Sequence, residues 1–230
     1  MKRLFLISAL ILLNASFLAA ANNVADRVVS AAVALKEISE ASDGNIPKDL
    51  LDKSSCVAVI PGMKKGGFIF GANYGKGLIS CRTENGDGPW SAPSMLLLQG
   101  GSFGLQIGAQ SVDLILLVMN VSGIESLLSS KFTLGGDVSI AAGPVGRTAA
   151  AETDAWMTAR ILAYSRTRGL FAGLIVKGGV IRPDSDANHV LYGKEIDPRQ
   201  ILFQKSGSVP KDAQIFLNQL TKMSPKRIRD

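Results

Sequence analysis

Between Cys56 and Arg182, apolar residues recur mostly at every second position, in short runs separated by glycine-rich turns. A period of two is that of a strand with one buried face. No long helical pattern separates the runs, whereas the crossovers of a parallel sheet require one. The middle of the chain therefore predicts a mostly antiparallel β-sheet, either open or closed into part of a barrel.

The turn residues predict where the individual strands end. Tyr74-Gly75-Lys76-Gly77 predicts a hairpin turn, and Lys177-Gly178-Gly179 predicts another. In Trp156 to Ser165 the alternation of apolar side chains favours a strand over a helix. The expected strands are 56–60, 67–73, 78–82, 94–99, 103–110, 113–120, 132–134, 138–142, 156–165, 170–176 and 180–182.

Helical patterns lie mainly at the two ends of the chain. Asn23 to Ala41 predicts an amphipathic helix, because apolar residues recur at steps of four and three: Val24, Val28, Ala31, Leu35 and Ile38. Pro210 to Lys222 predicts a C-terminal helix, and Gly123 to Ser130 a short mid-chain helix. Short helical segments are expected at 47–52, 186–192 and 198–203. The predicted fold class is α+β, in one domain over residues 22–230.

Residues 1–21 have the layout of a secretory signal peptide. Lys2-Arg3 is a positive n-region, Leu4 to Leu18 is almost wholly apolar, and Ala19-Ala20-Ala21 offers a cleavage site. The apolar run is shorter than the roughly 20 residues of a membrane span, and an uncleaved N-terminal anchor is the alternative. We therefore expect an exported protein, located in the periplasm or cell envelope or secreted from the cell.

Cys56 and Cys81 are the two cysteines of the chain. Each lies at the end of a strand-like run, so a disulfide across the sheet is one reading, closing a loop of about 25 residues. The other reading is two buried thiols that act as small apolar side chains. Two cysteines and a single histidine do not make a common zinc site, so neither a metal nor another cofactor is expected.

Basic residues gather in two segments that contain no acid. The first, between Asp52 and Glu84, holds Lys53, Lys64, Lys65, Lys76 and Arg82. The second, between Asp154 and Asp184, holds Arg160, Arg166, Arg168, Lys177 and Arg182. If both segments share one sheet face, they form a cationic patch that attracts anionic headgroups. The alternative is that these charges are solvated strand ends and loops.

Three arginines next to turns are candidates for holding a phosphate. Arg147 follows the Gly143-Pro144 turn, and Arg166 and Arg168 are two apart, so on a strand they face the same way. Two guanidinium groups on one face can hold a phosphate through several charge-assisted hydrogen bonds. Equally, these arginines can pair internally with acids near the same turns: Glu152, Asp154 or Asp184.

One motif suggests catalysis. Gly100-Gly101-Ser102-Phe103-Gly104 matches the G-x-S-x-G nucleophile elbow, which needs a strand, a sharp turn and then a helix. The residues that follow alternate as a strand does, and the one histidine, His189, lies in a turn-like stretch. A serine hydrolase using Ser102 is therefore the weakest of three hypotheses, and we expect a protein that is not an enzyme.

The glycine-, proline- and arginine-rich runs carry a family resemblance. They are Lys65-Gly66-Gly67-Phe68, Gly75-Lys76-Gly77, Trp90-Ser91-Ala92-Pro93, Gly104-Leu105-Gln106-Ile107-Gly108, Ala141 to Arg147, Tyr164 to Gly173 and Asn188 to Gly193. In this order and spacing they resemble the SYLF family, also called the Ysc84 or lipid-binding SYLF domain. The resemblance extends from about Leu51 to Phe203.

The resemblance implies binding of phospholipid and phosphoinositide headgroups, and in eukaryotic relatives binding and bundling of actin. Together with the acid-free segments, it predicts that the partner is an anionic membrane lipid surface; a protein partner is the alternative. Nucleic acid is not expected, because no aromatic-basic stacking motif is evident. The candidate lipid-binding residues are Lys64, Lys65, Lys76, Arg82, Arg147, Arg160, Arg166, Arg168 and Lys177.

Overall fold

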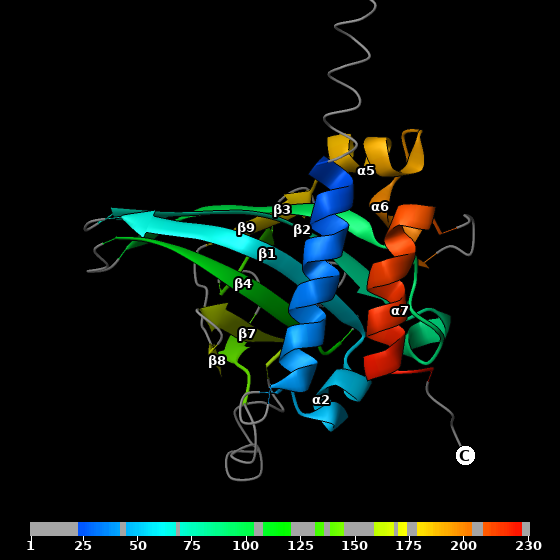
Figure 1. Ribbon diagram of the computed structural model, residues 1–230, viewed down its shortest axis with the longest axis horizontal. Helices are drawn as coiled ribbons and strands as arrows, with labels where there is room; N and C mark the ends of the chain where they lie inside the picture. The colour runs from blue at the N-terminus through cyan, green and yellow to red at the C-terminus, as the bar shows by residue number, and fades with distance from the viewer. Residues whose placement is uncertain are drawn as a thin grey trace, which may run out of the picture.

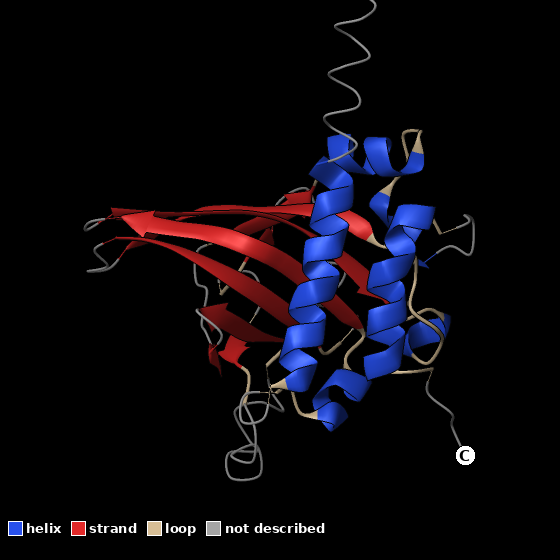
Figure 2. Cartoon of the chain, in the orientation of Figure 1, coloured by secondary structure: helices blue, strands red, loops and turns tan. Residues whose placement is uncertain are grey.

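The computed structural model describes residues 23–41, 45–67, 70–103, 108–120, 132–135, 139–144, 159–167, 170–173, 179–203 and 209–226. One curled sheet forms the body of the molecule, and helices lie against its outer face (Figure 1). The sheet reaches well past these helices on one side (Figure 2). The predicted α+β class, with a mostly antiparallel and curled sheet, is confirmed.

The strands pair in the order β5-β9-β3-β2-β1-β4-β7-β6, with β8 also on β7. Every pairing is antiparallel except that of β6 with β7. Their bounds are β1 (Cys56–Gly67), β2 (Phe70–Cys81), β3 (Ser94–Phe103), β4 (Gly108–Val118), β5 (Phe132–Thr133), β6 (Ile140–Ala142), β7 (Ile161–Thr167), β8 (Leu170–Gly173) and β9 (Val180–Pro183).

The expected helices at both ends of the chain are present. The N-terminal helix covers residues 23–40. The others are α2 (Lys48–Lys53), η1 (Glu84–Gly86), α5 (Ser185–Tyr192), α6 (Pro198–Phe203), η3 (Lys211–Ala213) and α7 (Gln214–Met223). The mid-chain helix expected at Gly123 to Ser130 lies outside the described residues. Among the helices that are described, none is long and apolar enough to cross a membrane.

Alternation along the strands creates two cores. Val57 and Val59 of β1 face the helices, where they meet Leu35 and Ile38 of the N-terminal helix and Phe216 of α7 in one cluster of buried residues. The intervening residues of β1, which are Cys56, Ala58 and Ile60, face the inside of the curl. There they join a second cluster of buried residues that includes Leu96 of β3 and Leu114 and Leu116 of β4.

Two of the predicted turns are wrong. β2 runs unbroken through Tyr74 to Gly77, so no hairpin turn forms there. The predicted hairpin around Lys177 to Gly179 also fails, because β8 pairs with β7 whereas β9 pairs with β3 and β5. A glycine run within a strand can mark close backbone approach as well as a turn, and local sequence does not separate the two.

Close approach is the reason for the glycines of β2. β1 carries one extra residue between Ile60 and Met63, which bulges it toward β2. A Cβ on Gly77 would lie 2.2 Å from the carbonyl oxygen of Val59, and one on Gly75 would lie 2.5 Å from Ile60 Cγ2. Gly62, inside the bulge, has a φ of 57°, a conformation that glycine adopts readily.

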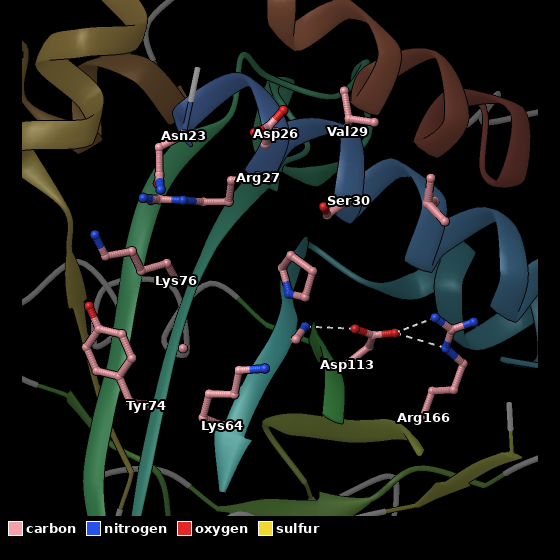
Figure 3. Close-up of a pocket in the computed structure, with 14 residues that line it drawn as sticks. Asn23, Asp26, Arg27, Val29, Ser30, Lys64, Tyr74, Lys76, Asp113 and Arg166 are labelled. Carbon is pink, nitrogen blue, oxygen red and sulfur yellow. Dashed lines mark hydrogen bonds and ion pairs between the residues drawn. The ribbon is translucent and has the colours of Figure 1, made fainter. Parts of the chain in front are cut away.

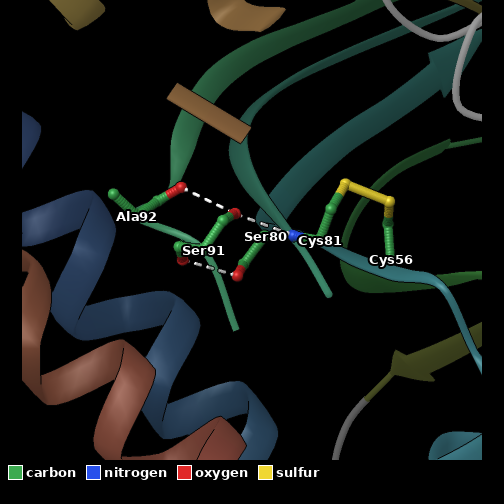
Figure 4. The surroundings of a disulfide bond; sticks show 5 residues. All are labelled: Cys56, Ser80, Cys81, Ser91 and Ala92. Carbon is green, nitrogen blue, oxygen red and sulfur yellow. Dashed lines mark hydrogen bonds between the residues drawn. A yellow bond between two sulfur atoms is a disulfide. The ribbon is translucent and has the colours of Figure 1, made fainter. Parts of the chain in front are cut away.

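Cys56 and Cys81 are direct partners in the β1–β2 register and are joined by a disulfide (Figure 4). The S–S distance is 2.07 Å, and both residues are fully buried in the inner core. The bond ties the first residue of β1 to the last residue of β2, 25 positions later in the chain.

Reducing this disulfide should lower the free energy of unfolding by about 3 kcal/mol, because an unfolded chain without the loop constraint gains conformational entropy. Equilibrium urea unfolding with and without a thiol reductant measures the difference. The double variant Cys56→Ala/Cys81→Ala is the matched control and should not respond to reductant. An unfolding midpoint of the unmodified chain that stays the same in reductant would contradict the prediction.

Candidate functional site

A cleft of about 590 Å³ lies between the N-terminal helix and the outer sheet face beside it (Figure 3). The helix contributes Asp26, Arg27, Val29, Ser30 and Val33. The sheet contributes Pro61, Gly62, Lys64, Tyr74, Lys76, Asp113 and Arg166. The cleft adjoins the part of β1–β4 that projects past the helices, because Lys64, Tyr74 and Lys76 belong to both. This part is here called the sheet extension: residues 63–67, 70–77, 99–103 and 108–112.

Strand alternation brings polar side chains onto the outer face of the sheet extension. Leu78 of β2 packs in the outer core, so Lys76 and Tyr74 face the same way farther along the strand, where both are exposed. Lys64 is the register partner of Tyr74 on one side and of Ser111 on the other, and Tyr74 pairs with Gln99. The outer face therefore carries a row of Gln99, Tyr74, Lys64 and Ser111.

The bulge in β1 decides the direction of Lys64. Ile60 points into the curl, and in a regular strand Lys64, four residues later, would point there too. Because the bulge adds one residue, Met63 takes the inward place and Lys64 turns outward, where it is exposed. Its ammonium donates to Ser111 Oγ over 3.2 Å.

Arg166 lies at the cleft wall but is held by acids. Its Nε and one terminal nitrogen donate to Asp113 Oδ2 over 2.9 and 2.6 Å, and its other terminal nitrogen pairs with Glu37 of the N-terminal helix. Asp113 Oδ1 accepts from the backbone N–H of Gly62 over 2.8 Å. Of the two alternatives for Arg166, internal pairing is the one observed, but its partners are Asp113 and Glu37 and not the acids named from the sequence.

Arg27 is also neutralised within the fold. Its guanidinium donates to Asp184 Oδ2 over 2.9 Å, with both side chains largely buried. Asp184 is the N-cap residue of α5, and its Oδ1 accepts from the Ala187 N–H over 3.3 Å. The exposed cations of the described cleft residues are therefore Lys64 and Lys76.

The other candidate cations that the structure describes do not gather at the cleft. Arg82 is 3% exposed and lies over the ring of Trp90, so it is not part of a surface patch. Arg160 is exposed, but it precedes β7, about 20 Å along that strand from Arg166. Lys65 is half-buried and follows Lys64 in the strand, so its side chain points toward the inner face of the sheet. Three further candidates lie outside the described residues: Arg147, Arg168 and Lys177.

Two of the sequence runs that indicated the family contact each other and hold the fold. Tyr192 Oη donates to the carbonyl of Pro93 over 2.7 Å, and Asn188 Oδ1 accepts from the Met95 N–H over 2.7 Å. Ser80 Oγ donates to the Ser91 carbonyl over 2.8 Å (Figure 4). Burial raises the pKa of Tyr192, so its hydroxyl remains a hydrogen-bond donor further into the alkaline range than that of an exposed tyrosine. These residues therefore have structural roles.

The structure rejects the Ser102–His189 arrangement. Ser102 lies within β3, paired with Gly71 of β2, and the next element that the structure describes is strand β4, whereas a nucleophile elbow requires a helix. His189 lies on α5, next to Asn188, which contacts Met95 near the other end of β3. Met95 and Ser102 are about 23 Å apart along the strand.

Among the described residues, no cluster of three or more His, Cys, Asp or Glu side chains is placed to hold a metal.

A curled, mostly antiparallel sheet, flanked by helices and bearing a cleft with two exposed lysines, defines an α+β domain with a polar surface cleft. Residues 99–223, more than half of the chain, match the family described as "Ysc84: Las17-binding protein actin regulator". The chain belongs to the Ysc84 (SYLF) family.

Similar proteins are named for binding or for an SH3 domain. "LAS seventeen-binding protein 3" of Saccharomyces cerevisiae is 37% identical over 70% of this chain and 35% of its own length. "SH3 domain-containing YSC84-like protein 1" of Rattus norvegicus is 31% identical over 84% of this chain and 57% of its own length. The chain thus spans between about a third and a little over half of these relatives.

Proposed function

We propose that the protein is a non-enzymatic module that binds anionic phospholipid, with phosphoinositide-like headgroups as the preferred class, at the cleft and the adjoining sheet extension. The observation that carries the proposal is the exposure of Lys64 and Lys76 next to Tyr74, Lys64 on the neighbouring strand and Lys76 on the same strand (Figure 3). Tyr74 is 48% exposed.

Apolar side chains at the same cleft favour a membrane surface over a free anion. Val29 and Val33, one helical turn apart, are 44% and 45% exposed. Tyrosine has an apolar ring and a polar tip, which suits the boundary between headgroups and acyl chains. Each lysine near an anionic surface adds about 1 kcal/mol of attraction. The site thus combines charge with a small apolar contact area.

The double variant Lys64→Gln/Lys76→Gln should bind anionic vesicles at least tenfold more weakly than the unmodified chain, because two cations near the surface are lost. Flotation with phosphatidylcholine vesicles, with and without an added anionic lipid, measures this. The matched control is Lys194→Gln/Lys211→Gln, two exposed lysines that do not line the cleft. Equal recovery of the unmodified protein on neutral and anionic vesicles would refute the proposal.

We further propose that the protein is exported and acts in the periplasm or cell envelope, or after secretion. The support is the signal-peptide layout of residues 1–21. The N-terminal sequence of the protein recovered from a periplasmic extract tests this. A chain found in the cytoplasm that still begins at Met1 would contradict it.

A protein partner is the second candidate function. It is favoured by the family description, which names Las17 binding and actin regulation, and by the name of the yeast relative. Co-sedimentation with filamentous actin, alongside the flotation assay, separates the two candidates. Pelleting with actin that is unaffected by Lys64→Gln/Lys76→Gln, together with no flotation, would favour the protein partner.

A further inference from the structure

The sheet extension has a strand edge that no described strand covers. β7 pairs with β4 only from Asp113 to Val118. β7 ends at Thr167, and β8 pairs with its last four residues, Tyr164–Thr167. The first five residues of β4, Gly108–Val112, pair with β1 on one side. On their other side no strand is paired within the part of the chain that the structure describes.

The sequence of this edge lacks the residues that usually keep strand edges from pairing. Natural edges are blunted by lysines, prolines, bulges or a covering element. The five residues of this edge are Gly108, Ala109, Gln110, Ser111 and Val112, none of which is charged or a proline. Gln110 and Ser111 are exposed. An extended backbone can therefore approach β4 closely here.

The charge beside the edge selects what can approach it. Lys64 of β1 reaches across β4, with its Nζ 3.2 Å from Ser111 Oγ. An added strand would lie about 4.8 Å beyond β4, so a carboxylate on its residue opposite Ser111 comes within reach of this ammonium. The nearby acid, Asp113, accepts from Arg166, which also pairs with Glu37, and from the Gly62 N–H. The charged group that contacts the Ser111 side chain is the Lys64 ammonium.

We infer that the Gly108–Val112 edge of β4 binds an extended acidic segment of a partner protein by strand addition. The end of the β7 pairing at Asp113 limits the added strand to about five residues, with a Glu or Asp at the position opposite Ser111. A second copy of this chain fits less well, because pairing of two β4 edges would bring two Lys64 side chains toward each other. The interaction uses backbone groups of the edge and does not depend on lipid binding by the outer face.

A nine-residue peptide of alternating Val and Thr with one central Glu is the probe, labelled with fluorescein and titrated with the full chain. We expect saturable binding, and binding at least tenfold weaker for a peptide N-methylated at alternate residues, which cannot pair along that edge. Replacing the peptide Glu by Gln should weaken binding about threefold, the size expected for one exposed charge pair. Lys64→Gln should have the same effect, and with the Gln peptide it should have none.

Amide chemical shifts identify the surface independently of any variant. The largest shifts on adding the Glu peptide should fall on Gly108–Val112, and those of β9 should not move. Equal binding of the N-methylated peptide, shifts concentrated elsewhere, or no binding at millimolar peptide would each overturn the inference. So would a concentration-dependent dimer that protects the same amides from exchange, because the occupant would then be a second copy. Vesicle flotation by the same preparation keeps this result separate from that of the lipid proposal.

Discussion

The variant Gly77→Ala should lose about 3 kcal/mol or more of unfolding free energy, although it adds a single methyl group. The new Cβ would lie 2.2 Å from the Val59 carbonyl oxygen and 2.9 Å from Ile60 Cα. Both are backbone atoms of β1, so no side-chain rotation relieves the overlap, and the two central strands must separate locally. Overpacking of this kind is among the few single changes that destabilise strongly. Equilibrium urea unfolding followed by circular dichroism measures the loss.

Ala72→Val is the matched control for this variant. Ala72 lies in the same strand and is exposed on the outer face, so two added methyl groups should change the unfolding free energy by no more than about 0.5 kcal/mol. A Gly77→Ala variant as stable as the control would show that β1 does not bulge onto β2. The outward direction of Lys64, and with it the proposed lipid site, would then lose its structural basis.

The variant Arg82→Met should lose about 2–4 kcal/mol, because it removes several buried hydrogen bonds from one charged group. Arg82 donates to the Ser224 carbonyl over 3.1 Å and to the Gly88 carbonyl over 3.3 Å. Trp90 Nε1 also donates to Ser224 O, over 2.8 Å, so this network fastens the end of α7 to the sheet. The methionine side chain keeps apolar atoms over the Trp90 indole, so the expected loss of stability comes from the missing guanidinium group.

The same variant should show a characteristic pH dependence. Burial raises the pKa of Asp52, but hydrogen bonds from Lys48 and Ser224 and the charges of Lys48 and Arg82 outweigh it, leaving that pKa below its usual value. A carboxyl whose pKa is depressed by folding stabilises the fold above its unfolded pKa, and this is lost as pH falls through the folded value. Arg82→Met removes part of this depression, so its stability deficit should be smaller at pH 3 than at pH 7.

Unfolding curves of both proteins at the two pH values test this, with Arg199→Met as the control. Arg199 is exposed on α6, and its loss should change stability by no more than about 0.5 kcal/mol at either pH. A deficit for Arg82→Met that is equally small would mean that the network does not hold α7 to the sheet. A deficit that grows toward pH 3 would contradict the assigned effect of Arg82 on Asp52.

The candidate site was only partly predictable, and the errors have a common cause. Lys64 and Lys76 were identified because an acid-free basic segment is visible in composition, and both are exposed at the cleft. Arg82 came from the same segment but is buried beneath Trp90 and Ser224, since its partner lies 142 positions away in the chain. Likewise Val29, Val33 and Tyr74 were not identified, because only tertiary packing shows which apolar residues remain exposed.

By itself the sequence determined the local and additive properties of this protein: the period-two runs that become strands, the amphipathic end helices, the family and the basic composition. Tertiary structure alone decided which strands pair, that the glycines of β2 admit a bulge, and that this bulge turns Lys64 outward. The physical reason is that side-chain direction in a strand depends on counting residues. One extra residue in β1 reverses every direction after it, and whether that residue bulges is settled by the neighbouring strands.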